Sequence, residues 1–119
     1  MEFRVEAGDL FYMDYIHSSD HTPVHDVFRI GEDGIVLIEE AFDWYGAGLE
    51  SVSNSGVSVS FSGNKTRVFM HREFPRFLLR VGRVAGHVIT YKDIRTPLLS
   101  VAKGGESVWV RVVKKERTE

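Results

Sequence analysis

Three histidines recur at four-residue intervals in the polar segment 17–26. On a helix, His17, His21 and His25 would form one imidazole stripe, and imidazole is a common ligand of transition metals. Pro23 lies within the stretch and its flanks favour strands, so we do not expect a helix. In an extended strand, residues four positions apart are separated by about 13 Å, too far to share one metal. The spacing therefore favours a polar connection between strands, and a metal site would need a loop that folds back.

The same segment carries alternating oxygen ligands in Ser18, Asp20 and Thr22. Calcium loops use such a pattern, but they need more carboxylates and a glycine at the tight turn. His17, Ser18 and Asp20 also supply the residue types of a hydrolytic triad. Their close spacing does not suit triad geometry, and the sequence has no nucleophile elbow. We therefore expect a protein that is not an enzyme and that carries no cofactor.

Two further groups of residues, a glycine segment and a basic stretch, could take part in binding. Gly46, Ala47 and Gly48 follow a group of aromatic residues, and such glycines permit a tight turn or the close approach of a ligand. A lone GxG is not a phosphate loop, so we expect only a turn or pocket formed by backbone. The second constellation is a locally basic stretch containing Arg67, His71, Arg72, Arg76, Arg80 and Arg83.

The basic stretch has two interpretations. In a β-strand these side chains alternate between two faces. They either form a solvated surface paired with carboxylates or recognise an anion. Arg72 precedes Phe74 and Pro75, which favour a turn. We predict that Arg72 is at least half buried and that its guanidinium forms a bidentate pair with Glu39 or Asp26.

Length and composition limit the overall architecture. The chain has 119 residues, of which 43% are hydrophobic, and this is enough for a single domain over 1–119. Fifteen basic and seventeen acidic residues argue against a nucleic-acid binder. The absence of cysteine excludes disulfides and thiolate zinc sites. No apolar run approaches the roughly 20 residues of a membrane helix, and the N-terminus has no apolar signal core.

The hydrophobic period is close to two, which is typical of strands. Val24, Asp26, Phe28 and Ile30 are predicted to share one face of a strand. Residues 96–103 favour a short helix or a bent strand, and residues 113–119 a frayed tail. Strands are expected at 10–16, 23–30, 35–39, 57–61, 66–70, 77–81, 87–91 and 107–113. We therefore predict an all-β fold, an antiparallel β-sandwich or small barrel of eight or nine short strands with at most one short helix.

Three segments together resemble a known family. Segment 17–28 resembles the opening motif HSVExTPVxExW of the family called domain of unknown function eighteen-fifty. Segment 37–49 resembles its LxExxFxSYGAGLP motif, and segment 72–87 resembles its later RxxPxxxLRVG…H signature. The sequence departs from the pattern with Asp20 and Asp26 in place of glutamates. The likeness extends over residues 10–113.

The resemblance implies a fold, a cellular setting and a set of site residues. Members are small all-β proteins encoded beside TAXI-type TRAP transporters, often with an N-terminal membrane or export segment. It implies an extracytoplasmic accessory protein that contacts the membrane only through an N-terminal anchor preceding this sequence. The matched polar residues are expected to converge on one spot, either as a structural network or as a site for a cation or small anion. They are His17, Ser18, Asp20, Thr22, Asp26, Glu39, Arg72 and His87.

Two functions follow from these observations. The first is a non-enzymatic accessory protein that binds a TRAP transporter permease or TAXI solute-binding protein. The alternative is a β-barrel that binds a metal or small ligand independently of transport, which rests on five histidines and on Asp20, Asp26 and Glu39.

Overall fold

The computed structural model describes residues 1–17, 21–43, 58–62, 65–82 and 84–113. These residues form nine strands in two antiparallel sheets and one 3-10 turn, so the predicted all-β class is confirmed. No helix in these residues is long and apolar enough to cross a membrane. Of the predicted tail 113–119, only Val113 is described, and it is exposed.

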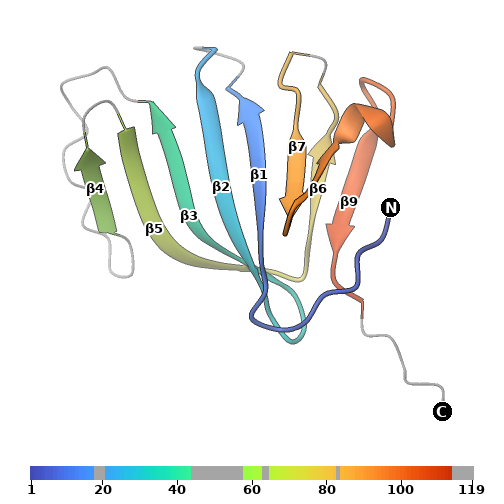
Figure 1. Ribbon diagram of the computed structural model, residues 1–119, viewed down its shortest axis with the longest axis horizontal. Coiled ribbons are helices and arrows are strands. Elements are labelled where there is room, and N and C mark those ends of the chain that lie inside the picture. The colour runs from blue at the N-terminus through green and yellow to red at the C-terminus, as the bar shows by residue number, and fades with distance from the viewer. Residues whose placement is uncertain (18–20, 44–57, 63–64, 83, 114–119) are drawn as a thin grey trace.

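The larger sheet has seven strands in the order β4-β5-β3-β2-β1-β7-β8, and it forms a broad curved layer (Figure 1). Each neighbouring pair is antiparallel. β1 and β2 have the predicted bounds, whereas β3 and β5 run several residues further than predicted. The strands are β1 (Leu10–Ile16), β2 (Pro23–Ile30), β3 (Ile35–Asp43), β4 (Ser58–Ser62), β5 (Lys65–Phe74), β7 (Val88–Tyr91) and β8 (Ile94–Pro97).

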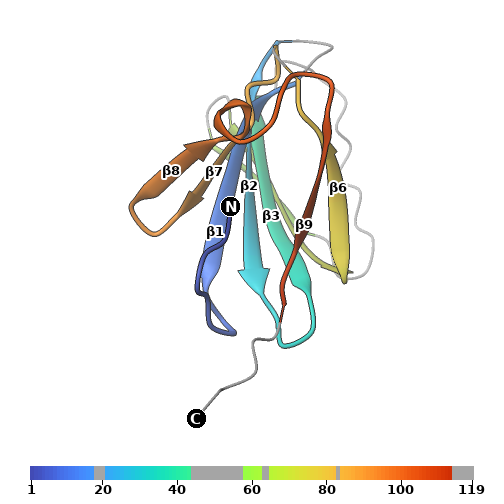
Figure 2. The same cartoon turned by 90° about the vertical axis from the view of Figure 1, so that its right-hand side faces the viewer.

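The smaller sheet pairs β6 (Arg76–Arg80) with β9 (Ser107–Arg111). The chain leaves β5 at Pro75 and continues as β6, which lies with β9 in a second layer over part of the larger sheet (Figure 2). Proline cannot donate a ladder hydrogen bond, so it suits this break between sheets. The larger sheet begins at β4 and ends at β8 without closing, so the sandwich is confirmed and the barrel is wrong.

The core lies between the two layers. On β1 and β2, alternate residues point to the covered side, as the period of two predicts. Val24, Asp26, Phe28 and Ile30 are all buried, which confirms their predicted common face. The Phe28 ring stacks on Phe11 at 4.9 Å and on Phe77 of β6 at 5.1 Å between ring centroids. These aromatic contacts join the two layers.

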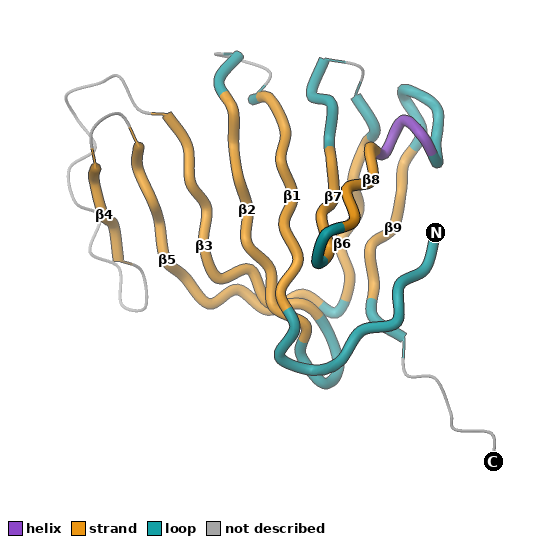
Figure 3. Tube along the Cα trace, in the orientation of Figure 1, coloured by secondary structure: helices purple, strands orange, loops and turns teal. Residues whose placement is uncertain are grey.

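Segment 96–103 is neither a regular helix nor a simple bent strand. Its first two residues belong to β8, where Pro97 lies opposite Val88, and a 3-10 turn follows at Leu98–Ser100 (Figure 3). The Leu98 side chain is buried, and its backbone N–H donates to the carbonyl of His87 at 2.9 Å. Strand pairing and this buried anchor therefore prevail over the helical preference of the segment.

A bulge in β3 reverses the side-chain pattern of that strand. Phe28 lies opposite Leu37 and Val27 opposite Glu39, which leaves Ile38 as the extra residue. A bulge changes which later residues point to each face. Residues 35 and 37 point to the core, but after the bulge it is Glu40 that shares the covered side with Asp26.

Candidate functional site

A pair of carboxyl groups occupies the covered side of the larger sheet. Asp26 on β2 and Glu40 on β3 are direct cross-strand partners, so their side chains lie on the same face. Asp26 is only 4% exposed, and Glu40 is half-buried. Strand alternation and the β3 bulge together place these two acidic groups side by side.

The environment of Asp26 favours its protonated form. Burial raises the pKa of Asp26 to about 8, and the hydrogen bond and negative charge of Glu40 act in the same direction. A hydrogen bond from Tyr15 lowers the Asp26 pKa by a smaller amount. Two neighbouring carboxylates cannot both ionise at low cost, so the pair holds a proton at neutral pH.

Two rings complete the cluster. Tyr15 on β1 stacks on His87, just before β7, with ring centroids 4.9 Å apart. Burial raises the pKa of Tyr15, and the charges of Asp26 and Glu40 add to this effect. Burial also lowers the pKa of His87. Both rings are therefore neutral at physiological pH, and they border the carboxyl pair as neutral hydrogen-bonding groups.

Two buried polar atoms of this cluster have no hydrogen-bond partner within the described residues. They are Oδ1 of Asp26 and Nδ1 of His87. Unsatisfied buried polar atoms are uncommon and costly, and they mark places where a proton, an ion or a ligand atom would be stabilised. We name Tyr15, Asp26, Glu40 and His87 the carboxyl cluster. Its chemistry is the sharing of a proton between the two carboxyl groups.

The structure brings only part of the predicted polar spot together. Asp26 and His87 both lie against Tyr15. His17 is exposed where β1 ends, and its backbone N–H donates to the carbonyl of Thr22 at 2.8 Å, which closes the β1–β2 connection. Five other predicted site residues lie outside the described residues. They are Ser18, Asp20, Gly46, Ala47 and Gly48.

Two predicted residues lie elsewhere. Glu39 is on the opposite side of the sheet from Asp26, where Arg67 binds it at 2.8 and 3.3 Å. Arg72 is exposed rather than half-buried, opposite Leu37, so its predicted burial is wrong. The predicted pairing with Arg72 is also wrong for Glu39, because the β3 bulge places that carboxylate beside Arg67.

Sequence reasoning missed two members of the carboxyl cluster. Tyr15 continues the alternation of Phe11 and Met13, both buried, so the strand pattern alone places it on the covered face. Glu40 could not be found in this way. Alternation from Ile35 and Leu37 predicts that Glu39, not Glu40, lies on the covered face. Only the bulge, which depends on pairing with β2 and β5, reveals it.

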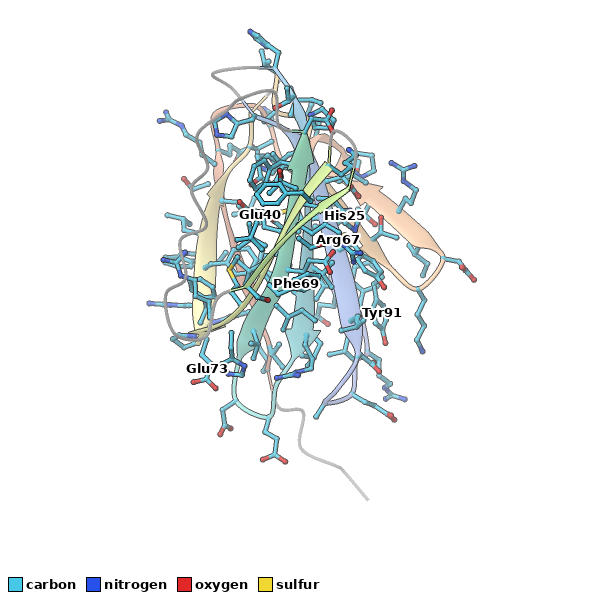
Figure 4. The ribbon with its side chains drawn as sticks, turned by 90° about the vertical axis from the view of Figure 1, so that its left-hand side faces the viewer. His25, Glu40, Arg67, Phe69, Glu73 and Tyr91 are labelled. Carbon is cyan, nitrogen blue, oxygen red and sulfur yellow. The ribbon has the colours of Figure 1, made fainter. Side chains whose placement is uncertain are left out.

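The opposite, outer face of the sheet carries a shallow depression. Nδ1 of His25 lies 2.6 Å from Oδ1 of Asp14, and the His25 ring stacks on Tyr12 with centroids 5.4 Å apart. Thr90 and Arg95 complete the lining. Figure 4 shows His25 and Arg67 on the side of the sheet away from Glu40. Among the described residues, no three histidine or carboxylate side chains are grouped to hold a metal.

These features define a small β-sandwich with adjacent Asp26 and Glu40 carboxyl groups on its covered side and a polar depression on its outer face. The chain belongs to the family described as a domain of unknown function (DUF1850), whose model matches residues 11–98. This match confirms the resemblance inferred from the motifs. No curated protein and no solved structure matches the chain.

Proposed function

We propose that the protein is a non-enzymatic accessory protein of a TAXI-type TRAP uptake system, acting outside the cytoplasmic membrane. In this role it binds the permease or the solute-binding protein. The resemblance to the family supports the proposal, because it implies that the gene lies beside such a transporter. The proposal assigns a binding surface rather than a reaction.

The observation that carries the proposal is the ordered polar surface on the outer face of the larger sheet. Arg67 bridges to Glu39, and Nζ of Lys65 lies 2.6 Å from Asp43. Beside them lies the depression that contains His25 and Arg95. Polar groups already held in place lose little conformational freedom when a partner binds. A strand-supported face of this kind suits contact with another folded protein.

Co-purification tests this function. The tagged protein is expressed with the solute-binding protein and permease, and complexes are captured in mild detergent. We expect the wild type to retain one of these components and Arg95→Glu, in the depression, to lose most of it. Glu32→Ala, in the β2–β3 turn, is the control and should behave as the wild type. Absence of any association with all components expressed would overturn the proposal.

The alternative function is binding of a cation or small ligand in the carboxyl cluster, independently of transport. The observation that favours it is the buried, unpartnered Oδ1 of Asp26 beside Glu40. Metal analysis of untagged protein and melting curves with calcium or zinc test it. Stoichiometric metal that is lost in Asp26→Asn would support this function. A metal-free preparation whose melting temperature neither ion changes would exclude it.

A further inference from the structure

The smaller sheet has two faces of opposite character. Residues on β6 and β9 alternate strictly between half-buried and exposed. The inward side chains, Phe77, Leu79, Val108 and Val110, pack against the core. The outward side chains are Arg76, Leu78, Arg80, Ser107, Trp109 and Arg111. We name this outward set the arginine–tryptophan face; it belongs to the layer formed by β6 and β9 in Figure 2.

Two large apolar side chains occupy the centre of this face. Leu78 and Trp109 are cross-strand partners, and they are 50% and 52% exposed. Adjacent side chains on neighbouring strands form a continuous apolar patch rather than isolated exposed residues. Such a patch with a polar rim is typical of an interaction surface.

Arginines surround the apolar pair. Arg76 and Arg111 lie directly opposite each other, and Arg80 lies opposite Ser107. Like charges opposite each other destabilise a sheet, and an external negative charge would relieve this repulsion. Arg76 lies over the Trp109 ring at 4.3 Å, and none of the three arginines forms an ion pair within the described residues.

The positive charge of this face contrasts with the rest of the molecule. The chain has a net charge of −2, yet the six outward side chains include three arginines and no acidic residue. The nearest acidic residue along the chain is Glu106, whose carboxylate accepts a hydrogen bond from the backbone of Lys103 at 2.6 Å. An anionic surface would therefore attract this face.

We propose that the arginine–tryptophan face binds the surface of an anionic phospholipid membrane. Tryptophan prefers the boundary between lipid headgroups and hydrocarbon. Transfer of the Leu78 side chain from water to this boundary is also favourable, because it buries apolar surface. Arginine stems lie along apolar surface while their guanidinium groups reach the phosphates. The central apolar residues and peripheral cations of the ribbon match the hydrocarbon boundary and the phosphate layer of such a membrane. The protein would then lie on the membrane without crossing it.

The arginine–tryptophan face and the depression belong to opposite outer surfaces of the sandwich, so a membrane-bound protein keeps the depression free. The inference does not depend on the proposed function, because lipid binding needs no transporter component.

Vesicle sedimentation tests the inference directly. The probes are vesicles of phosphatidylglycerol with phosphatidylcholine and vesicles of phosphatidylcholine alone. We expect the wild type to sediment with the first at low salt, not with the second, and to dissociate as salt is raised. Arg80→Glu with Arg111→Glu should weaken binding at least about twenty-five-fold, because each basic side chain near such a surface contributes about fivefold.

A matched variant controls for net charge. Arg72→Glu with Arg95→Glu makes the same charge change at exposed arginines outside the face, and it should bind anionic vesicles much more strongly than the first double variant. Circular dichroism melting confirms that both variants are folded. In a Trp44→Phe background, the fluorescence of Trp109 should shift to shorter wavelength with anionic vesicles.

Three results would overturn the inference. The first is failure of the wild type to bind anionic vesicles at low salt. The second is equal weakening in the two double variants, because this would show an effect of net charge alone. The third is binding to an acidic polypeptide such as polyglutamate in place of vesicles, which would identify the face as a protein-docking surface.

Discussion

Asp26 and Glu40 lie directly opposite each other on β2 and β3, with Asp26 almost completely buried. Two carboxylates in this arrangement repel each other, and the loss of water around them increases the cost. The protein avoids this cost by holding a proton, since burial raises the pKa of Asp26 to about 8. The stability of the fold is therefore linked to pH through this pair.

The first prediction concerns the pH dependence of stability. An unfolded aspartate has a pKa near 3.9, so between about pH 4 and pH 8 the folded protein holds the Asp26 proton and the unfolded chain does not. The pair's contribution to stability is complete below this range and is lost as pH rises through it. We expect Asp26 to lower the free energy of unfolding by up to about 1.4 kcal/mol per pH unit.

Urea denaturation across this pH range tests the prediction. Asp26→Asn cannot ionise, so its stability should fall less steeply with pH than that of the wild type. Glu32→Gln removes an exposed carboxylate in the β2–β3 turn and provides the control for general charge effects. Identical slopes in Asp26→Asn and wild type would show that Asp26 is ionised in the folded protein at neutral pH.

The second prediction concerns Thr66 on β5. Its side chain is 0% exposed, and its hydroxyl has no hydrogen-bond partner within the described residues. Thr66→Val replaces this hydroxyl with a methyl group of similar size. Because a buried unsatisfied polar group costs about 1–3 kcal/mol, we expect the variant to be more stable by about 1 kcal/mol.

The melting temperature and the denaturation midpoint measure this effect. Thr90→Val on the outer face is the matched control, and we expect it to change stability by less than about 0.5 kcal/mol. If Thr66→Val were less stable than the wild type, the hydroxyl would have to contribute a favourable contact.

Strand positions were predictable from sequence where side chains alternate cleanly. The bounds of β1 and β2 agree with prediction, because hydrophobic and polar residues there follow the pleat. The β3 bulge was not predictable, because it depends on how β2 and β5 pair with β3. Segment 94–97 was not predicted as a separate strand, because residues 96–103 were assigned to a short helix or bent strand. In the structure, 94–97 pairs with β7 in a local hairpin that turns at Lys92 and Asp93.

The same limit applies to the polar residues. The motifs identified Asp26 and His87, but the burial that changes their pKa values arises from the sandwich. From the sequence, we predicted only that the side chains of the basic stretch divide between two faces of a strand. Arg76 and Arg80 share a face with Arg111 only because β6 pairs with β9. The first residues of these two strands, Arg76 and Ser107, are 31 positions apart in the sequence. Pairing between strands that are distant in the sequence therefore creates both the depression and the arginine–tryptophan face.

The third prediction compares two arginines. Arg67 bridges to Glu39, but the Arg67 side chain is 50% exposed, so solvent weakens the interaction. We expect Arg67→Ala to cost less than about 1 kcal/mol. Arg72 is exposed, so Arg72→Ala should change stability by less than about 0.5 kcal/mol.

A double-mutant cycle with Arg67→Ala and Glu39→Gln measures the pair directly. The coupling energy should be favourable and below about 1 kcal/mol. A loss of several kcal/mol in Arg72→Ala would contradict the exposed position of that side chain and would restore the idea of a buried arginine anchor.

The last prediction concerns the glycine in the β2–β3 turn. A Cβ atom at Gly34 would lie 2.6 Å from the carbonyl oxygen of Phe74, close to where β5 gives way to β6. The Gly34 carbonyl also accepts a hydrogen bond from Gly31 at 2.8 Å, which holds the turn in place. Because the clash is with backbone, Gly34→Ala must shift either the turn or the strand connection. We expect a loss of about 1–3 kcal/mol, measured by urea denaturation.

Glu32→Ala in the same turn is the control, because Glu32 is exposed and its truncation should be nearly neutral. The displaced connection begins β6, so Gly34→Ala should also alter packing of Phe77 against Phe28. Near-ultraviolet circular dichroism reports on that aromatic packing and should change in Gly34→Ala but not in Glu32→Ala. Unchanged stability and an unchanged spectrum in Gly34→Ala would show that the turn does not fix the position of the smaller sheet.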